Sequence, residues 1–206
     1  MDAPNLDPSV KAVIDRLETR IAGERQQMGQ GKFDRDKLAL AAGPDSAGLL
    51  NLLIRTKKAQ RIVEVGTSIG YTALWLGEAA RATGGHVIGM EYVADKHAQA
   101  IQNLKDAGLS DVVEVRRGDA KAILRDIESR IDLAFVDAWK DDYIHYFDAL
   151  LPKMSLGGVI VADNITRPES SAELMKLYQA HVRARPNVRS SFLSIGSGLE
   201  MSVRTA

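Results

Sequence analysis

The chain has 206 residues, of which 27 are basic and 27 acidic, so its formal net charge is zero and no bulk charge attracts a polyanion. It contains no cysteine, which excludes disulfides, thiolate zinc sites, iron–sulfur clusters and cysteine nucleophiles. A metal site in this chain would therefore be built mostly from oxygen ligands, which select hard ions such as magnesium, calcium or manganese.

The N-terminal residues 1–5 are polar and acidic, where a signal peptide would be basic and then apolar. No apolar run approaches the roughly 18 residues of a membrane span, so we expect a cytoplasmic protein without a membrane partner. Asp7 and Pro8 mark the start of a helix that Gly29 or Gly31 would end. After a polar turn at residues 31–34, two further helical stretches are expected at residues 38–42 and 45–55.

From residue 61 onward, short apolar segments alternate with amphipathic stretches. The expected strands are residues 61–65, 86–90, 112–116, 131–136 and 159–162, and the expected helices are residues 73–82, 94–107, 120–127, 143–151 and 172–184. This alternation predicts an α/β fold with a parallel, doubly wound sheet covered by helices on both faces.

The last part of the chain has a different pattern. Residues 188–193 and 199–204 flank a glycine-containing turn and predict a closing β-hairpin. The sequence shows no internal repeat, low-complexity tract or linker. We therefore expect one domain over residues 1–206, in which a helical segment (1–58) precedes a sheet-containing core (59–206).

A glycine-containing turn, EVGTSIG, follows the first expected strand at residues 64–70. Glycine lets the backbone approach a ligand, and the helix N-terminus beyond it offers free N–H groups to a carboxylate or phosphate. The pattern is neither G-x-G-x-x-G nor a Walker A loop. Glu64, ahead of Gly66, would repel a pyrophosphate but suits a cationic amino group, so an amino-acid-like group attached to a nucleoside fits the turn. The alternative is a turn that binds no ligand.

Two acidic residues end the next two expected strands. Glu91 lies somewhat further from the glycine turn than the ribose-binding acid of doubly wound folds, and it either binds a ribose or caps the next helix. Asp119 either accepts a hydrogen bond from the exocyclic amine of a base or caps the helix that begins at Ala120.

A cluster of polar residues follows the fourth and fifth expected strands. Asp137 and Lys140 follow one of these strands, and Asp163 and Asn164 follow the other. If the two strands are neighbours, two carboxylates and an amide converge, and a hard divalent ion would relieve their repulsion. A lysine beside such an ion loses its proton more readily than one in water, so Lys140 is a candidate general base. The alternatives are that each aspartate caps a turn, that Lys140 pairs with a surface acid, and that Trp139 packs in the core.

Three segments together resemble the cation-dependent O-methyltransferases of the catechol and caffeoyl-CoA type: EVGTSIGYT (64–72), FVDAWKDDY (135–143) and GGVIVADN (157–164). The resemblance extends from about residue 42 to residue 200. It implies an enzyme that uses S-adenosylmethionine and has a Rossmann-like, seven-stranded, mostly parallel sheet with an antiparallel last strand, which agrees with the hairpin inferred above.

The resemblance also implies roles for individual residues. The cofactor would contact Ala42, Glu64, Gly66, Ser68, Thr72, Glu91 (ribose) and Asp119 (adenine region). Magnesium or another hard divalent cation would be held by Asp137, Asp163 and Asn164. Lys140 would be the general base, Glu200 would bind the second hydroxyl of a catechol, and Trp139 and Pro168 would flank its ring. Proton transfer to Lys140 would then precede attack of the substrate oxygen on the cofactor methyl.

This chain departs from the family pattern in two ways. Ala138 stands where catechol-type members tend to carry histidine, which alters the adenine pocket, and the insertions of the plant caffeoyl-CoA enzymes are not apparent. A compact catechol is therefore the expected substrate, and a homodimer through the N-terminal helix is expected from family habit.

Three alternatives remain at this point. A hydroxylated tRNA nucleoside could be the substrate, although zero net charge makes nucleic acid less favourable as a partner. A nicotinamide oxidoreductase and a non-catalytic nucleotide-binding module are the other two, and the missing second glycine argues against both.

Overall fold

The computed structural model describes residues 6–28 and 37–206, so residues 1–5, the polar turn at 31–34 and the predicted helix end at Gly29 or Gly31 lie outside the described residues. Helix α1 (Pro8–Met28) begins where the Asp7 carboxylate accepts the N–H of Ser9 at 2.9 Å. Its apolar side chains recur at helical spacing and all are buried, namely Val10, Val13, Ile14, Leu17 and Ile21. This face of α1 packs against the helices that cover the sheet.

Seven strands form one sheet in the order β3-β2-β1-β4-β5-β7-β6. They are β1 (Arg61–Val65), β2 (His86–Glu91), β3 (Val113–Arg117), β4 (Ile131–Val136), β5 (Met154–Ala162), β6 (Val188–Leu193) and β7 (Leu199–Arg204). Strands β1 to β5 are parallel, whereas β7 pairs antiparallel with both β5 and β6. The predicted mostly parallel sheet with an antiparallel last strand is confirmed.

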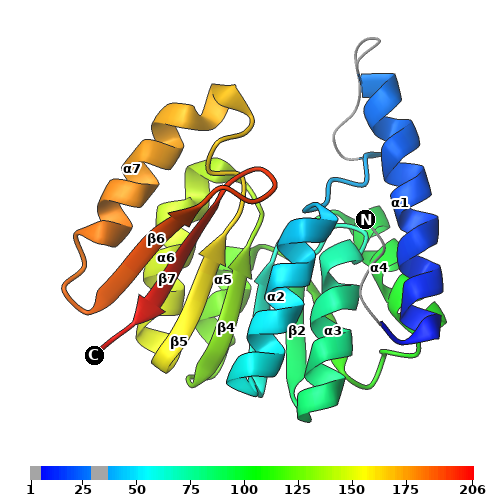
Figure 1. Ribbon diagram of the computed structural model, residues 1–206, viewed down its shortest axis with the longest axis horizontal. Helices are drawn as coiled ribbons and strands as arrows, with labels where there is room; N and C mark the ends of the chain where they lie inside the picture. Colours follow the sequence, from blue (N-terminus) through cyan, green and yellow to red (C-terminus); the bar gives the residue numbers. More distant parts are fainter. Residues whose placement is uncertain (1–5, 29–36) are drawn as a thin grey trace.

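Helices cover both faces of the sheet (Figure 1). One layer contains α1, α2 (Pro44–Lys57), α3 (Tyr71–Thr83) and α4 (Ala94–Asp106), and the other contains α5 (Ala120–Asp126), α6 (Tyr143–Leu150) and α7 (Ala172–Arg183). Strand alternation separates the two apolar cores, because Ile62 and Phe135 face the first layer while Val63 and Val136 face the second. None of the described helices is both long and apolar enough to cross a membrane.

The predicted helix at residues 38–42 is wrong. Residues 38–42 are not helical, and the backbone N–H of Ala39 donates instead to Glu24 Oε2 at 2.6 Å. Alanine and leucine favour a helix locally, but this tertiary bond from α1 holds the segment in an irregular path.

The topology places a ligand site at one edge of the sheet. Because β1 to β5 are parallel, their carboxyl ends lie at one edge of the sheet. The strand order runs outward from β1 to β3 on one side and from β4 to β5 on the other, so the direction of the crossovers reverses between β1 and β4. In open α/β sheets, ligands bind beyond the carboxyl ends of the strands at such a switch point.

Candidate active site

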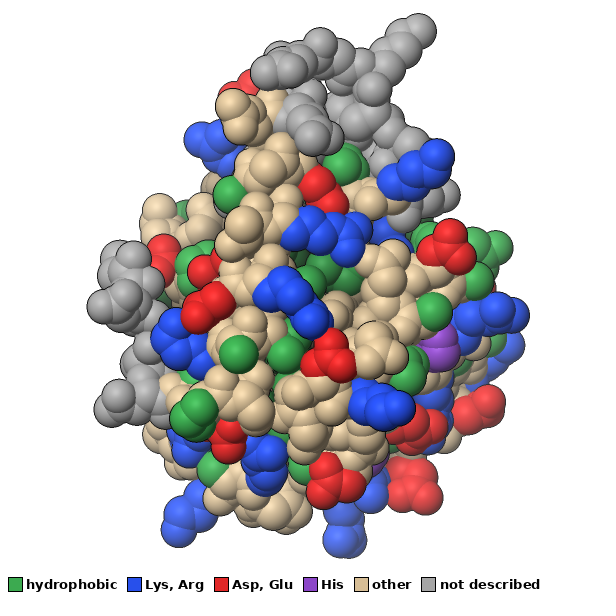
Figure 2. All heavy atoms as spheres, turned by 90° about the vertical axis from the view of Figure 1, so that its right-hand side faces the viewer, with side chains coloured by type: hydrophobic (Ala, Val, Ile, Leu, Met, Phe, Trp, Pro, Cys, Tyr) green, Lys and Arg blue, Asp and Glu red, His purple; other side chains and the backbone are tan. Residues whose placement is uncertain are grey.

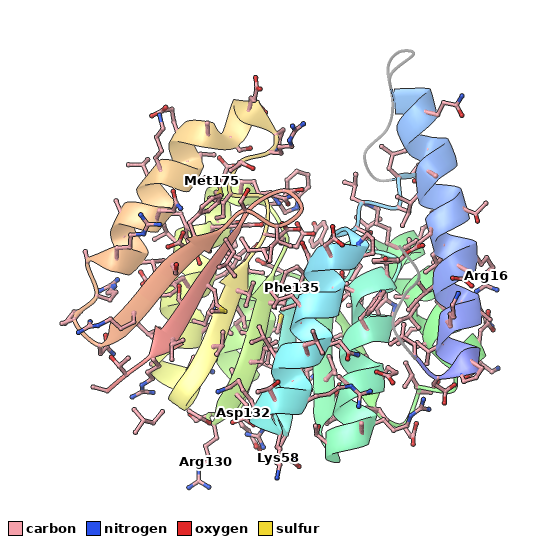
Figure 3. All side chains as sticks on the ribbon, viewed as in Figure 1. Arg16, Lys58, Arg130, Asp132, Phe135 and Met175 are labelled. Carbon is pink, nitrogen blue, oxygen red and sulfur yellow. The ribbon has the colours of Figure 1, made fainter. Side chains whose placement is uncertain are left out.

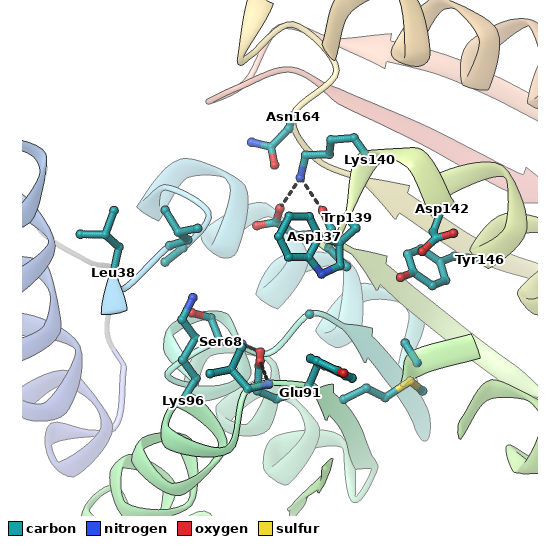
Figure 4. Close-up of a pocket in the computed structure, with 18 of the residues that line it drawn as sticks. Leu38, Ser68, Glu91, Lys96, Asp137, Trp139, Lys140, Asp142, Tyr146 and Asn164 are labelled. Carbon is teal, nitrogen blue, oxygen red and sulfur yellow. Dashed lines mark hydrogen bonds and ion pairs between the residues drawn. The ribbon is translucent and has the colours of Figure 1, made fainter. Parts of the chain in front are cut away.

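A cavity of about 700 Å³ lies at this edge, and Figure 4 shows the side chains that line it. Its size is typical of small-molecule sites. Nine of the residues inferred from the sequence line it, namely Gly66, Ser68, Glu91, Asp119, Asp137, Trp139, Lys140, Asn164 and Pro168. The structure therefore gathers the residues that follow β1, β2, β3, β4 and β5 around one space.

The glycine turn after β1 brings three strand ends together. Gly66 has φ +95°, and a Cβ there would collide with the backbone carbonyl oxygen of Asp137. The N–H of Gly66 donates to the Met90 carbonyl at 3.1 Å. Ser68 has φ +50°, and its N–H donates to Glu91 Oε2 at 2.7 Å. The close approach of the turn to the residues after β4 thus requires glycine at position 66.

Glu64 is fully buried, and neither carboxylate oxygen has a hydrogen-bond partner among the described residues. Burial raises the pKa of Glu64 to about 8; the nearby Thr67 hydroxyl acts against this shift, and the charges of Asp137 and Glu91 add to it. Four other predicted site residues are buried and do not line the cavity, namely Glu64, Thr72, Ala42 and Asp163. A buried carboxyl group without a partner is suited to a ligand that brings a cationic donor.

Asp119 realises the capping alternative as well as facing the cavity, whereas Glu91 faces the cavity without capping α4, whose N-cap is Val93. Glu91 Oε1 accepts the N–H of Val93 at 2.7 Å, while its other oxygen holds Ser68. Asp119 is the N-cap of α5, where Oδ1 accepts the N–H of Lys121 at 2.9 Å. Both carboxylates therefore organise the loops from which they face the cavity.

Strands β4 and β5 are neighbours in the sheet, which is the condition under which Asp137 and Asp163 were expected to converge. Val136 is paired with Ala162, so Asp137 and Asp163 follow adjacent register positions. The N–H of Asp163 donates to the Val136 carbonyl at 3.0 Å. The buried hydroxyl of Tyr143 lies 3.3 Å from that carbonyl and 3.2 Å from the carbonyl of Asp163, so α6 braces both strand ends.

The two aspartates and Asn164 form a donor set of oxygens. Asp163 Oδ1 accepts the N–H of Asn164 at 2.6 Å, while Oδ2 is buried and has no partner among the described residues. Burial and the charge of Asp137 raise the pKa of Asp163. The described residues contain no group of three or more His, Cys, Asp or Glu side chains placed to hold a metal, so the amide oxygen of Asn164 is the third protein ligand available. An unpartnered carboxylate oxygen beside a second carboxylate fits a hard cation.

Lys140 is held at the cavity wall from the short helix η2 (Lys140–Asp142). Its Nζ lies 3.1 Å from Asp137 Oδ1 and 2.9 Å from the Ala138 carbonyl oxygen, as the dashed lines in Figure 4 show. The side chain is only 14% exposed. Trp139 is 55% exposed and lines the cavity, so it is not a core residue.

The structure does not bring Glu200 to the cavity, which corrects its expected role toward a catechol hydroxyl. Its carboxylate is buried and accepts hydrogen bonds from Gln179 (2.6 Å), Arg183 (3.0 Å) and Ser190 (2.6 Å). The physical reason is strand alternation: β7 lies between β5 and β6, and residue 200 faces α7 while Leu199 joins the opposite apolar core.

Several cavity residues escaped the sequence reasoning. They come from the helices and from the segment after α1, and include Glu24, Leu38, Lys96, Lys121, Asp142 and Tyr146. Asp142 lies in the FVDAWKDDY segment, but neither there nor at the other positions does the sequence pattern assign the side chain to the cavity. Only the tertiary fold turns these side chains toward the cavity.

Comparison with known proteins gives a consistent result. The sequence matches the O-methyltransferase family over residues 32–205. It is 35% identical over 133 residues to a catechol O-methyltransferase of Niastella koreensis, covering 63% of this chain and 60% of that protein. It is 31% identical over 172 residues to a catechol O-methyltransferase of Mycobacterium tuberculosis, covering 81% of this chain and 76% of that protein.

Solved structures share the fold. An O-methyltransferase from Bacillus cereus in complex with S-adenosylhomocysteine superposes with a TM-score of 0.76 at 24% identity, covering 94% of this chain and 91% of that chain. A Podospora anserina methyltransferase with S-adenosylhomocysteine bound gives a TM-score of 0.81 at 21% identity, covering 100% and 91%.

Proposed function

Because this chain belongs to the O-methyltransferase family, we propose that it moves the methyl group of S-adenosylmethionine to a hydroxyl of a small catechol-type aromatic, with Lys140 as general base. The observation that carries the proposal is the meeting of Asp137, Asp163 and Asn164 with Lys140 at the ends of β4 and β5. Two relatives of matching sequence are catechol O-methyltransferases, which favours this substrate class.

The first half of the cavity suits the cofactor. Glu64 offers an unpartnered carboxylate to its amino group, with Gly66, Ser68, Thr72 and Ala42 around the amino-acid part. Glu91 and Asp119 lie further along, where the ribose and the adenine region would be held. When bound, S-adenosylmethionine supplies an electrophilic methyl group on a sulfonium.

The second half of the cavity suits a cation and the aromatic substrate. Asp137, Asp163 and Asn164 would hold magnesium or another hard divalent cation, as their oxygen donors indicate. When bound, such a cation supplies positive charge that lowers the pKa of a catechol hydroxyl. Trp139 and Pro168, on opposite loops of the cavity, would flank the ring.

Lys140 receives the proton in this proposal. Its Nζ, in the neutral form, accepts the proton from one hydroxyl, and that oxygen forms a bond to the methyl carbon. The carbon–sulfur bond breaks, and its electron pair stays on sulfur to give S-adenosylhomocysteine. Holding the reacting atoms in line supplies several of the roughly 7–11 kcal/mol available from orientation.

The test is methyl transfer to a panel of small catechols, with and without EDTA. Asp137→Ala and EDTA should each abolish transfer, and Lys140→Met should lower turnover by about a hundredfold or more. Lys140→Met should leave S-adenosylhomocysteine binding within a few-fold of the unmodified protein in calorimetry. Full activity in EDTA, or an active Lys140→Met variant, would contradict the proposed chemistry.

A further inference from the structure

A buried amide on helix α4 holds the glycine turn from the side away from the cavity. Asn103 is 7% exposed, and its Nδ2 donates to the backbone carbonyl oxygen of Ile69 at 2.8 Å. Within the described part of the chain, no other donor reaches this carbonyl. Gly70 approaches the same face of α4, because a Cβ on Gly70 would lie 3.2 Å from the Cα of Ala100, three residues before Asn103. One face of α4 therefore holds residues 69 and 70 of the turn.

Helix α1 sets the orientation of this amide. Arg16, labelled in Figure 3, donates to Asn103 Oδ1 at 2.8 Å and to Asp106 Oδ2 at 2.9 Å. A guanidinium can only donate a hydrogen bond and a backbone carbonyl can only accept one. The amide oxygen of Asn103 therefore has to face Arg16, and its NH2 group has to face Ile69. A continuous chain of hydrogen bonds thus joins α1 to the glycine turn.

The turn brings Ser68 to the cavity in a left-handed backbone conformation. Ser68 has φ +50°, lines the cavity and donates its N–H to Glu91 Oε2 at 2.7 Å. This conformation costs a serine free energy, so the turn keeps its shape only while neighbouring groups fix it. Glu91 fixes the backbone at Ser68, and Asn103 fixes the peptide that follows Ile69.

We propose that Asn103 is a positioning residue for cofactor binding, which keeps the glycine turn in the shape that receives the amino-acid part of S-adenosylmethionine. Asn103 does not line the cavity, so it acts through the turn alone. Arg16 contributes by holding the amide in the orientation that donates to Ile69. This role of Asn103 rests on the part of the proposed function that places the cofactor at the glycine turn, and on neither the catechol nor the cation.

The test compares Asn103→Leu with Asn51→Leu, because leucine keeps the branched shape of the side chain and removes its polar atoms. Asn51 is a matched control on α2: it is also 7% exposed, its Nδ2 donates to the Trp75 carbonyl at 2.8 Å, and it does not line the cavity. Both variants should melt at a lower temperature, since each leaves a buried carbonyl without a donor. In calorimetry, Asn103→Leu should bind S-adenosylhomocysteine about tenfold more weakly than the unmodified protein, and Asn51→Leu within about twofold of it.

Arg16→Met tests the same chain of hydrogen bonds from the protein surface, where the Arg16 side chain is 55% exposed and its loss should leave the protein folded. The freed amide can rotate, so the affinity for S-adenosylhomocysteine should fall by about threefold. Arg16→Lys, which still offers a donor, should restore most of this affinity. The control is Lys11→Met, which removes a cation whose ion pair with Asp15 lies within α1 and should leave the affinity unchanged.

Steady-state methyl transfer provides a second readout. Asn103→Leu should raise the KM for S-adenosylmethionine and leave kcat within about twofold, because Asn103 contacts neither reacting group. Equal affinities for S-adenosylhomocysteine in folded Asn103→Leu and Asn51→Leu would overturn the positioning role. If Asn103→Leu does not fold, an affinity of Arg16→Met equal to that of Lys11→Met overturns it. A protein whose S-adenosylhomocysteine affinity depends on Asn103 but which methylates no catechol would support the positioning role and contradict the proposed substrate.

Discussion

At the scale of single residues, the buried carboxyl group of Glu64 is the feature with the clearest consequence. It lies at the centre of the sheet in β1 and has no hydrogen-bond partner among the described residues. A natural chain retains such a group at a cost to stability, and ligand binding is a physical reason for it.

The free energy of unfolding should depend on pH through the ionisation of Glu64. The folded-state pKa of Glu64 is about 8, above the ordinary 4.5, so the neutral form is favoured in the folded chain. The neutral Glu64 carboxyl group makes its full contribution to the free energy of unfolding below about pH 4.5. This contribution is lost as the pH rises to about 8, because the folded chain has to ionise a buried group that ionises readily when unfolded. Relative to Glu64→Gln, the unmodified protein should therefore lose on the order of a few kcal/mol of unfolding free energy between about pH 5 and about pH 9.

Urea unfolding at the two pH values measures this difference. Glu173→Gln is the control, because that carboxylate is exposed and should leave the pH dependence unchanged. Parallel pH profiles for Glu64→Gln and the unmodified protein would show that Glu64 ionises at its ordinary pH in the folded chain.

At the scale of elements, α6 holds the ends of β4 and β5 through the hydroxyl of Tyr143. Tyr143→Phe should lower the unfolding free energy by about 1 kcal/mol, because the carbonyls of Val136 and Asp163 lose the one hydroxyl hydrogen that they share. If Asp137 and Asp163 hold a divalent cation as proposed, the substitution should also weaken activation by magnesium, because both residues follow these strand ends. Thermal unfolding and a magnesium titration of methyl transfer measure the two effects.

Tyr178→Phe is a matched control for this change. Tyr178 is equally buried and packs edge-on against Tyr143 at 5.6 Å between ring centroids, but its hydroxyl has no partner among the described residues. Its removal should be neutral or stabilising. A Tyr143→Phe variant that behaves like Tyr178→Phe would indicate that the hydroxyl does not support the strand ends.

The elements also show how far the sequence could predict this fold. The bounds of β1, β4, β6 and β7 are those expected from apolar and β-branched runs, because each strand's pattern is local. Residues 38–42 could not be predicted, because the bond from Glu24 to Ala39 joins positions 15 apart. The position of Glu200 depends on β7 lying between β5 and β6, which no local pattern indicates.

The residues of the candidate site also fall into those that the sequence could predict and those that it could not. Gly66, Asp137 and Asn164 follow strand ends, and a parallel sheet gathers strand ends at one edge, so the sequence was sufficient. Lys121 and Asp142 are on helical turns whose orientation depends on packing between elements. Their pairing across two loops is visible only in the structure.

At the scale of the whole molecule, opposite charges are dispersed. Figure 2 shows acidic and basic side chains interspersed on the face that includes α1, and three ion pairs on this helix are Lys11–Asp15, Arg16–Asp106 and Arg20–Glu24. A nucleic-acid partner would be favoured by a gathered basic surface, which this face lacks.

The apolar side of α1 is used within the chain, since Val10, Ile14 and Leu17 are buried in the core shared with α3 and α4. A homodimer through this helix, as proposed from family habit, would therefore use its polar side. Sedimentation at several salt concentrations tests this, because an interface built on charged side chains weakens as salt is added.

Among residues 6–28 and 37–206, four non-glycine residues have left-handed backbone conformations, and they lie at opposite edges of the molecule. Ser68 and Asn164 line the cavity, whereas Lys58 and Arg130 lie at the other ends of the strands (Figure 3). Lys58 ends α2 with φ +53°, a position that glycine adopts without strain.

Lys58→Gly should therefore raise the melting temperature by about 1–3 °C without changing turnover. The control is Thr56→Gly, at an exposed position two residues earlier inside α2, which should lower it because glycine weakens a helix. A lower melting temperature for Lys58→Gly would show that its left-handed conformation carries no strain.

The same backbone conformation at Ser68 and Asn164 has a different meaning for protein engineering. Glycine at either position would also relax the backbone, yet it would loosen the turn that reaches Glu91 or remove the amide oxygen beside Asp163. A screen for thermostability alone would favour these substitutions and select against catalysis, whereas Lys58 offers stabilisation without that trade-off. Lys58 is therefore a position that can be changed to glycine for stability, whereas Ser68 and Asn164 should be kept for activity.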